Sequence, residues 1–288
     1  MRAQTRTKVG DPAGMLRIGT SGYQYRHWRG RFYPRDVAMS RWLEYYADRF
    51  ETVELNATFY RLPESRAFRR WASLVPDGFC FAVKASRYLT HVLRLKDPRE
   101  PVERLMDRAS HLDDHLGPIL LQLPPTLPLE LERLEETLAA FPPHVRIAVE
   151  PRHASWFVPP TKALLARYDA ALCLADRHSR HPAEWRTAAW TYLRFHEGRS
   201  RPRPCYGRSA LAAWVRRLGD GWGEQPDAYV YFNNDHRGCA VRDAAVFGHI
   251  AGRSDMATTR VPTTRQTSVG WEGRSGSTRS SSPCSARG

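Results

Sequence analysis

Apolar residues recur along this chain in short runs, and most runs are followed by a segment with helical spacing. The most distinctive run is 52–59, in which apolar residues alternate with Glu54, Asn56 and Thr58. An alternation with a period of two predicts a β-strand with one polar face. A strand that directs a carboxylate, an amide and a hydroxyl to one side needs polar partners or water there. We therefore interpret 52–59 as one wall of a functional cavity.

Seven further runs predict strands, at 16–22, 80–86, 118–124, 146–152, 170–176, 188–196 and 228–234. Predicted helices lie between them, at 40–50, 65–74, 129–140, 161–168, 209–218 and 241–250, together with a longer region that is interrupted by prolines and ends near 116. Such alternation favours parallel strands joined by right-handed crossovers. Eight units over roughly 240 residues predict a single-domain α/β fold of the (β/α)₈ TIM-type barrel class.

An open doubly wound sheet is the alternative arrangement for the same order of elements. The loop after the first strand reads Gly-Thr-Ser-Gly at 19–22, which lacks the G-x-G-x-x-G spacing of nucleotide-binding sheets. We therefore favour the closed barrel.

Composition divides the chain into three parts. Residues 1–14 are polar and are expected to be a disordered extension, and 15–253 form the barrel. Residues 254–288 are dominated by Ser, Thr, Arg and Gly, so we expect either disorder or a stretch translated out of frame. The early loss of apolar periodicity predicts an incomplete or irregular C-terminal end of the barrel.

The net charge of +14 is spread along the chain rather than concentrated in one block. Once both ends are set aside, 15–253 retains a charge of +9, which suits an anionic partner. Only four of the 44 basic residues are lysine, and such a skew reflects genome composition more often than ligand choice. The sequence has no dense basic segment that would make nucleic-acid binding compelling.

The five cysteines are far apart and form no C-x-x-C pair, which argues against a zinc ribbon or a thioredoxin-type site. No apolar run is long enough for a membrane span, and the basic N-terminus is not followed by a secretory signal. We therefore expect a cytoplasmic protein with reduced cysteines and without a membrane partner.

Polar residues gather where the predicted strands end. In a (β/α)₈ barrel these ends and the following loops form the functional face. The candidates, in chain order, are Glu54, Asn56, Lys84, Gln122, Glu150, His153, Asp176, Arg194, His196, Asn233 and Asp235. Their occurrence at the same end of at least six strands predicts a shared site, although ion-pair networks also place charges inside proteins.

These residue types suggest acid–base chemistry on an anion. Glu54 and Glu150 are candidates for general acid and base, provided that their surroundings separate their pKa values. His153 and His196 are candidates for proton transfer or metal binding, or else for hydrogen-bonded wall positions. Lys84 and Arg194 suit a ligand phosphate or carboxylate, or else they neutralise the two glutamates.

A divalent metal held by Glu54, Glu150 and Asp176 is a weaker alternative, since Lys84 and Arg194 compete for the same carboxylates. We predict no cofactor.

Loop aromatics at the same end could stack on a sugar or base, or could form a hydrophobic lid. They are Tyr23, Tyr25, Trp28, Tyr60 and Trp156.

Several of these segments together resemble the YecE-like family, a domain of unknown function. They are GTSGYQYRHWRGRFYP at 19–34, TVELNATFYRLP at 52–63, FAVKAS at 81–86 with the later Thr90-His91, LLQLPP at 120–125, AVEPRHASW at 148–156, YLRFHE at 192–197 and YFNND at 231–235. The resemblance covers 15–250 and implies a TIM-type barrel without implying a reaction. It adds His91 to the ligand-binding candidates. Pro151 departs from the family, which more often has an aromatic residue there.

We therefore expect an enzyme, a hydrolase or an isomerase, that acts on a sugar phosphate or a nucleic-acid component. A metal-dependent phosphodiester hydrolase of the endonuclease-IV-like type is an alternative that rests on fold analogy. A non-catalytic barrel that binds nucleic acid or another ligand is the second alternative.

Overall fold

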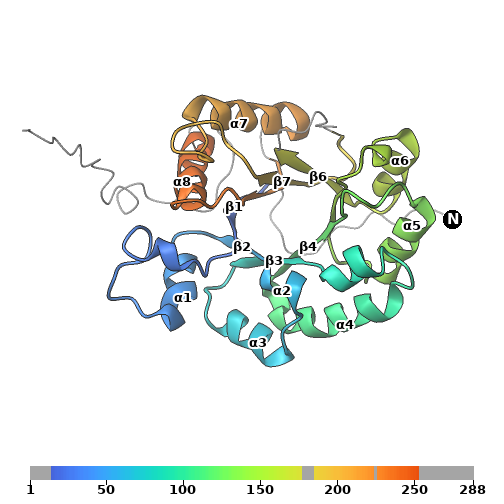
Figure 1. Ribbon diagram of the computed structural model, residues 1–288, viewed down its shortest axis with the longest axis horizontal. Helices are drawn as coiled ribbons and strands as arrows, with labels where there is room; N and C mark the ends of the chain where they lie inside the picture. Colours follow the sequence, from blue (N-terminus) through green and yellow to red (C-terminus); the bar gives the residue numbers. More distant parts are fainter. Residues whose placement is uncertain (1–13, 177–184, 224–225, 253–288) are drawn as a thin grey trace, which may run out of the picture.

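Eight parallel strands close into a barrel in chain order in the computed structural model, which describes residues 14–176, 185–223 and 226–252 (Figure 1). The strands are β1 Leu16–Ser21, β2 Thr52–Leu55, β3 Cys80–Lys84, β4 Leu116–Gln122, β5 Ile147–Glu150, β6 Ala171–Asp176, β7 Thr191–Phe195 and β8 Ala228–Phe232. The predicted (β/α)₈ barrel is confirmed.

Helices surround the barrel and cover the outer face of its strands (Figure 1). They are α1 Trp42–Ala47, α2 Ala57–Tyr60, α3 Ser65–Ser73, α4 Arg99–Ala109, α5 Leu131–Ala140, α6 Pro159–Arg167, α7 Arg208–Trp222 and α8 Cys239–Gly252. Short helical turns η1 Arg26–Trp28, η2 Met39–Arg41, η3 Tyr88–Val92, η4 Ser110–His115 and η5 Ala154–Trp156 complete the connections. None of the helices within the described residues is long and apolar enough to cross a membrane.

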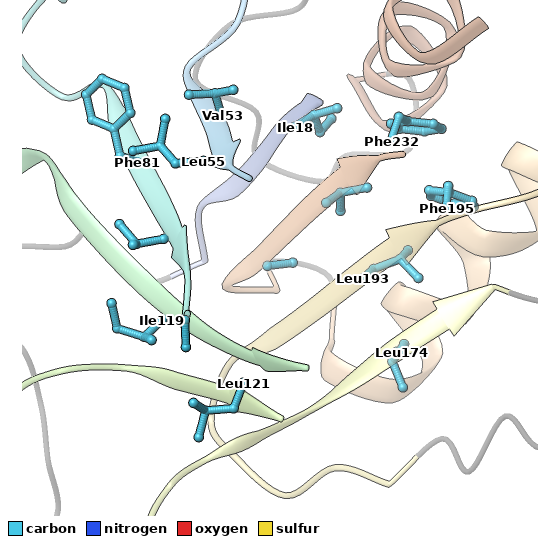
Figure 2. Packing of buried hydrophobic residues seen from close by; sticks show 14 of the residues in the cluster. Ile18, Val53, Leu55, Phe81, Ile119, Leu121, Leu174, Leu193, Phe195 and Phe232 are labelled. Carbon is cyan, nitrogen blue, oxygen red and sulfur yellow. The ribbon is translucent and has the colours of Figure 1, made fainter. Parts of the chain in front are cut away.

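The strands are buried on both faces, and each face has its own packing. Figure 2 shows the outward side chains, among them Val53, Phe81 and Leu193, which belong to the large apolar cluster beneath the helices. The inward set is smaller and consists of Cys80, Ala82, Leu120, Ala148, Ala171, Cys173, Ala188, Trp190, Tyr192, Tyr229 and Tyr231. These inward residues fill the barrel beneath its C-terminal mouth, so the centre is a packed core.

Gly19 of β1 lies at a point where two barrel strands approach closely. A Cβ at this position would lie 2.0 Å from the carbonyl oxygen of Thr52 on the neighbouring strand β2. The close approach requires glycine, because any side chain would push the two paired strands apart.

The predicted strand 52–59 is wrong beyond Leu55. Strand β2 ends at Leu55, and residues Ala57–Tyr60 form the short helix α2 instead. The side chains after Leu55 therefore no longer alternate between the two faces of the sheet. The Thr58 hydroxyl donates to the carbonyl oxygens of Leu55 and Lys84. These bonds turn the chain over the barrel mouth, so only Glu54 of the predicted polar stripe points into the barrel.

The expectation of an incomplete barrel end is also wrong. β8 pairs with β1 in continuous register from Leu16↔Ala228 to Thr20↔Phe232, which closes the sheet. Helix α8 extends two residues beyond the predicted segment 241–250 at each end. The proposed disordered extension at 1–14, apart from its last residue, and the tail at 254–288 lie outside the described residues.

Candidate functional site

Arg194 lies at the centre of the barrel mouth and joins two carboxylates. One terminal nitrogen donates to Glu54 Oε1 at 2.7 Å, and the other donates to Glu150 Oε2. The arginine is 1% exposed, and both glutamates are equally buried. Burial opposes its charge, but the two carboxylates outweigh this effect and raise the pKa of Arg194 well above its usual value. The three side chains form a closed ion-pair network.

Glu54 receives two further hydrogen bonds, one from β1 and one from β7. The hydroxyl of Ser21 donates to Oε1 at 2.8 Å, and that of Tyr192 donates to Oε2 at 2.7 Å. Both of its oxygens are therefore bonded, as a buried carboxylate requires.

Glu150 is held by three other side chains besides Arg194. Gln122 donates to both carboxylate oxygens at 3.0 Å, and Arg152 Nε donates to Oε1 at 3.0 Å. His196 Nε2 lies 3.8 Å from Oε1. Burial raises the pKa of Glu150, but Arg194, His196 and Arg152 together hold it well below its usual range. The carboxylate therefore stays ionised at neutral pH.

Lys84 lies at the same level of the barrel but without a partner. In the described part of the chain its ammonium makes no hydrogen bond or ion pair, and Nζ lies 4.1 Å from the centre of the Phe59 ring. Burial and the nearby charge of Arg194 lower the pKa of Lys84 to about 8, although Glu54 and Glu150 oppose the shift. A substantial fraction of this amine is neutral just above physiological pH.

His91 lies on η3, beside the same aromatic ring. The rings of Phe59 and His91 meet edge to face with centres 5.0 Å apart, and His91 Nδ1 contacts the Thr90 hydroxyl at 2.8 Å. Burial, together with the charges of Lys84 and Arg152, lowers the pKa of His91 to about 4. The imidazole is therefore neutral at physiological pH.

Arg194 is occupied by carboxylates of the protein itself rather than open at the mouth. Its terminal nitrogens donate to Glu54 and Glu150, and the side chain is buried. The alternative that Arg194 neutralises the two glutamates describes the geometry. Lys84 does not share this task, because its amine pairs with neither carboxylate.

His153 and Trp156, predicted as site residues after the fifth strand, form hydrogen bonds with loop residues. His153 Nδ1 contacts the Ser155 hydroxyl at 2.8 Å and accepts the Ser155 N–H at the start of η5. Trp156 is fully buried, and its indole N–H donates to the carbonyl oxygen of Leu127. Neither side chain joins the charged residues at the mouth.

The ligand-binding candidates Asn56 and Tyr60 lie at the two ends of α2 and differ in exposure. Asn56 precedes this helix, and its Oδ1 is buried and accepts no hydrogen bond from the described residues. Tyr60 is 81% exposed on the opposite end of the short helix.

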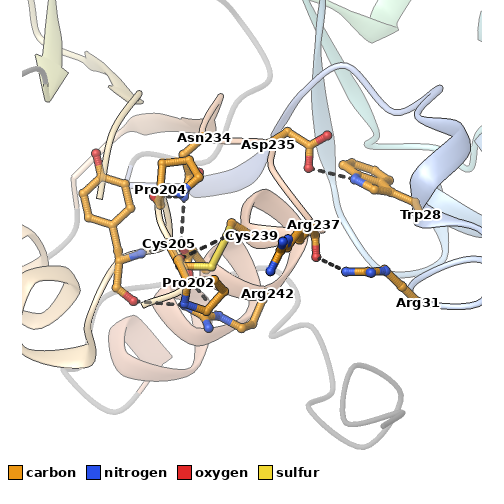
Figure 3. Close-up of a disulfide and its surroundings, with 12 residues drawn as sticks. Trp28, Arg31, Pro202, Pro204, Cys205, Asn234, Asp235, Arg237, Cys239 and Arg242 are labelled. Atoms are coloured by element: carbon orange, nitrogen blue, oxygen red, sulfur yellow. Dashed lines mark hydrogen bonds and ion pairs between the residues drawn. A yellow bond between two sulfur atoms is a disulfide. The ribbon is translucent and has the colours of Figure 1, made fainter. Parts of the chain in front are cut away.

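The aromatic loop after β1 forms a packed lid, as the second interpretation of these residues predicted. Tyr23 and Trp28 are buried, so they offer no open face for a ligand to stack on. The indole N–H of Trp28 donates to Asp235 Oδ1 at 2.8 Å (Figure 3). His27 Nε2 lies 2.8 Å from Oδ2 of the same carboxylate. Asp235 therefore fastens this loop to the end of β8.

A cavity of about 440 Å³ opens beside the network, between the loops that follow β7 and β8. His196, Asn233 and Asp235 line it, together with Glu197, Gly198, Arg203, Pro204, Asn234 and His236. Asn233 Nδ2 lies 3.1 Å from His196 Nδ1. Because an amide nitrogen only donates, Nδ1 accepts and the ring proton of neutral His196 lies on Nε2, nearer Glu150. His196 therefore connects the cavity with the charged centre.

A disulfide joins the two loops that line this cavity (Figure 3). Cys205 and Cys239 are bonded, with their Cα atoms 5.0 Å apart and a sequence separation of 34 residues. The prediction of reduced cysteines is wrong for this pair, because the fold brings together positions that the sequence keeps apart. Cys80 and Cys173 are buried and lie outside this disulfide.

The predicted metal ligands do not meet. Asp176 accepts the indole N–H of Trp214 on α7, whereas Glu54 and Glu150 are bonded to Arg194. Among the residues that the structure describes, no three His, Cys, Asp or Glu side chains are grouped to hold a metal ion.

Sequence reasoning left out two residues of the mouth, Tyr192 and Ser21. Tyr192 precedes Arg194 by two positions on β7, so strand alternation alone places both on the inner face. Ser21 ends β1 beside Glu54. The two-residue alternation of β7 is the signal that could have identified Tyr192, since it lies two positions before Arg194. Tyr192 was missed because only charged and amide side chains at strand ends were considered as candidates.

Comparison with known proteins places this architecture among uncharacterised barrels. Over 116 residues the chain is 35% identical to the UPF0759 protein YecE of Escherichia coli K12, a match that covers 40% of this chain and only 43% of YecE. It is 24% identical over 271 residues to the UPF0759 protein YunF of Bacillus subtilis, covering 79% of this chain and 91% of YunF.

Solved structures of DUF72 family proteins show the same fold. One from Thermotoga maritima superposes with a TM-score of 0.73 at 28% identity, over 83% of this chain and 99% of that one. One from Enterococcus faecalis superposes with a TM-score of 0.70 at 18% identity, over 83% and 96%. The chain matches the family described as "Protein of unknown function DUF72" over residues 17–266. The chain therefore belongs to the DUF72 family, whose members include the YecE-like proteins that the sequence segments resemble.

Proposed function

We propose that this protein is an enzyme that binds a small anionic ligand at the barrel mouth and moves a proton with Lys84. The observation that carries the proposal is the unpaired Lys84 amine, which faces a site where the neighbouring charges are otherwise bonded. An amine with a pKa of about 8 exchanges protons readily near neutral pH, as a general acid or base must.

Arg152 supports the anionic character of the ligand. Its Nε donates to Glu150, but within the described residues neither terminal nitrogen has a partner. The side chain is partly exposed, and a guanidinium fork matches a carboxylate or phosphate. The carboxylate of Glu150 connects this fork to His196 and hence to the cavity of about 440 Å³. We assign anion binding to Arg152 and Lys84 in place of Arg194.

The proton-transfer role passes from the two glutamates to Lys84 for an electrostatic reason. Glu150 is held ionised, and both carboxylates are bonded to Arg194, so a proton delivered to either one would weaken the network. They position the other groups and maintain a fixed field at the mouth.

Anion binding can be tested by calorimetry with inorganic phosphate and with glycolate. We expect binding at pH 7 that weakens at pH 9.5, where Lys84 is largely neutral. Arg152→Gln should reduce affinity at least tenfold, which corresponds to about 1.4 kcal/mol. Arg66→Gln, on the exposed surface of α3, is the matched control and should leave affinity unchanged. Equal binding by both variants, or none by the wild type, would contradict the proposal.

Proton transfer can be tested by incubating sugar phosphates and hydroxy or oxo acids with the protein in deuterated water. Nuclear magnetic resonance should detect deuterium beside a carbonyl or hydroxyl carbon with the wild type and with Arg66→Gln. Lys84→Met should abolish the exchange, and exchange that persists in this variant would assign the chemistry elsewhere.

A further inference from the structure

Lys84 has the surroundings of a nucleophilic amine as well as those of a proton carrier. It ends β3 on the inner face, in line with Cys80 and Ala82, and it retains 9% exposure at the mouth. Its Nζ lies 4.1 Å from the centre of the Phe59 ring, and within the described part of the chain it bonds no anion. A lysine without a hydrogen-bonded carboxylate keeps its lone pair available once it loses its proton.

The nearest carboxylates are prevented from capturing this amine. Glu54 is bonded by Ser21, Tyr192 and Arg194, and Glu150 has four donors or cations of its own. The barrel therefore satisfies its negative charges with other groups. An unpaired lysine beside satisfied carboxylates has no structural task, and its burial has a stability cost.

We infer that Lys84 forms a Schiff base with a small carbonyl compound that carries a carboxylate or phosphate. The inference rests on the proposed function and names its substrate class: the anionic group binds Arg152, and the carbonyl carbon reaches Lys84 Nζ.

The step balances without a further reactant. The neutral amine attacks the carbonyl carbon, forming a C–N bond while the carbonyl π electrons move to oxygen. The nitrogen then loses a proton, and the oxygen takes up two protons from solvent and leaves as water, which gives a protonated imine. No oxidant or reductant takes part, and the anionic group stays unchanged.

The chain is well suited to a direct test, because it has only four lysines, Lys8, Lys84, Lys96 and Lys162. Lys96 and Lys162 are exposed and serve as internal references. The full-length protein is incubated at pH 7.5 with pyruvate or dihydroxyacetone phosphate and sodium cyanoborohydride, which reduces an imine to a stable amine. Peptide mass spectrometry then measures the adduct at each lysine.

We expect Lys84 to be modified at least tenfold faster than Lys96 or Lys162, despite its lower exposure. At pH 7.5 an amine with a pKa of about 8 is neutral roughly two hundred times more often than an amine with the reference lysine pKa of 10.5. The rate at Lys84 should rise between pH 7 and 9. Lys96→Met, the matched variant, should leave the adduct on Lys84 unchanged.

Arg152→Gln separates recognition from reactivity. It should slow modification of Lys84 by pyruvate at least tenfold and leave modification by acetone, a neutral ketone, unchanged.

Modification of Lys84 no faster than that of Lys96 and Lys162 would overturn the inference. If phosphate and glycolate still bind through Arg152 in that case, anion binding survives and only the Schiff base is lost. If those anions do not bind either, the proposed function fails with it.

Discussion

Arg194 and Lys84 are both cations at strand ends in the mouth of this barrel, but their surroundings differ. Arg194 is bonded to Glu54 and Glu150, and the pKa of the arginine is raised. Lys84 lies near the same carboxylates, makes no ion pair in the described part of the chain, and has a lowered pKa. The difference separates the part of the site that fixes the structure from the part that is free to react. A buried charge without a partner is costly, and such costs are typical of functional positions.

The two positions also differ in how their geometry is held. Arg194 bridges strands on different sides of the barrel, β2 and β5, through hydrogen bonds. The Lys84 amine lies against the ring of Phe59 on the short helix α2 and, among the described residues, makes no ion pair. The arginine therefore locks the relative positions of the strands, whereas the lysine can be displaced by a ligand without unlocking them.

Removing the paired cation should produce the largest effect. Arg194→Met removes the cationic partner of buried Glu54 and one of the cations beside buried Glu150, and should lower the free energy of unfolding by about 3–5 kcal/mol, measured by urea denaturation at pH 7. Adding Glu54→Gln and Glu150→Gln should recover much of this loss, because the buried charges are then gone. Arg41→Met, which breaks an exposed pair with Glu44, should cost less than about 1 kcal/mol. If Arg41→Met and Arg194→Met lower the free energy of unfolding by similar amounts, Arg194 does not stabilise the buried carboxylates as predicted.

Removing the unpaired cation, Lys84, should raise the free energy of unfolding rather than lower it. The pKa of Lys84 is about 8 in the folded protein and 10.5 in the unfolded chain, so the unfolded chain binds more protons between these values. The stability of the wild type should therefore rise with pH across this interval. Lys84→Met lacks this dependence and should be more stable than the wild type at pH 7, by about 3 kcal/mol.

The measurement for Lys84→Met is urea denaturation of both proteins at pH 7 and pH 10.5. The stability difference should narrow by about 3 kcal/mol over this range. A difference that does not change with pH would mean that the lysine is paired or hydrated in solution.

The smallest expected effect concerns the hydroxyl support of the paired side. Tyr192→Phe removes the donor to Glu54 Oε2 and should cost about 2 kcal/mol, because a buried charged oxygen loses its hydrogen bond. Tyr231→Phe is the matched control: it removes a bond to the Thr52 hydroxyl, which is neutral, and should cost about 1 kcal/mol. Thermal or urea unfolding of both variants measures the difference. A larger loss of stability for Tyr231→Phe than for Tyr192→Phe would contradict the prediction that the charged Glu54 oxygen depends more strongly on its hydrogen bond than the Thr52 hydroxyl does.

Much of the fold could be predicted because its signals are local. The runs at 80–86 and 146–152 contain β3 and β5, and the end of each run supplies a charged residue, Lys84 or Glu150. Errors occurred where tertiary contacts override the local pattern. The alternation at 52–59 continues past Leu55 in sequence, but hydrogen bonds of the Thr58 hydroxyl turn the chain into α2.

The candidate site also contains residues that local signals identify and residues whose position depends on tertiary packing. Residue type and position at strand ends identified Glu54, Lys84, Glu150 and Arg194, because strand ends meet at one face of a barrel. The aromatic residues Trp28 and Trp156 lie in loops at that face but are buried, since loop packing is not encoded in a period. The disulfide between Cys205 and Cys239 likewise depends on two loops that meet only in the folded chain.

The sequence by itself determined that eight strands and their helices form a barrel and that charged groups gather at its mouth. These features follow from periodicity and from the direction of parallel strands, which each segment carries alone. Only the tertiary structure decided which cation is paired. Arg194 and Lys84 are both basic residues at strand ends, but only the reach of Arg194 across the barrel allows its two terminal nitrogens to bond carboxylates on β2 and β5. Pairing depends on distances between strands, and those distances exist only after the barrel has closed.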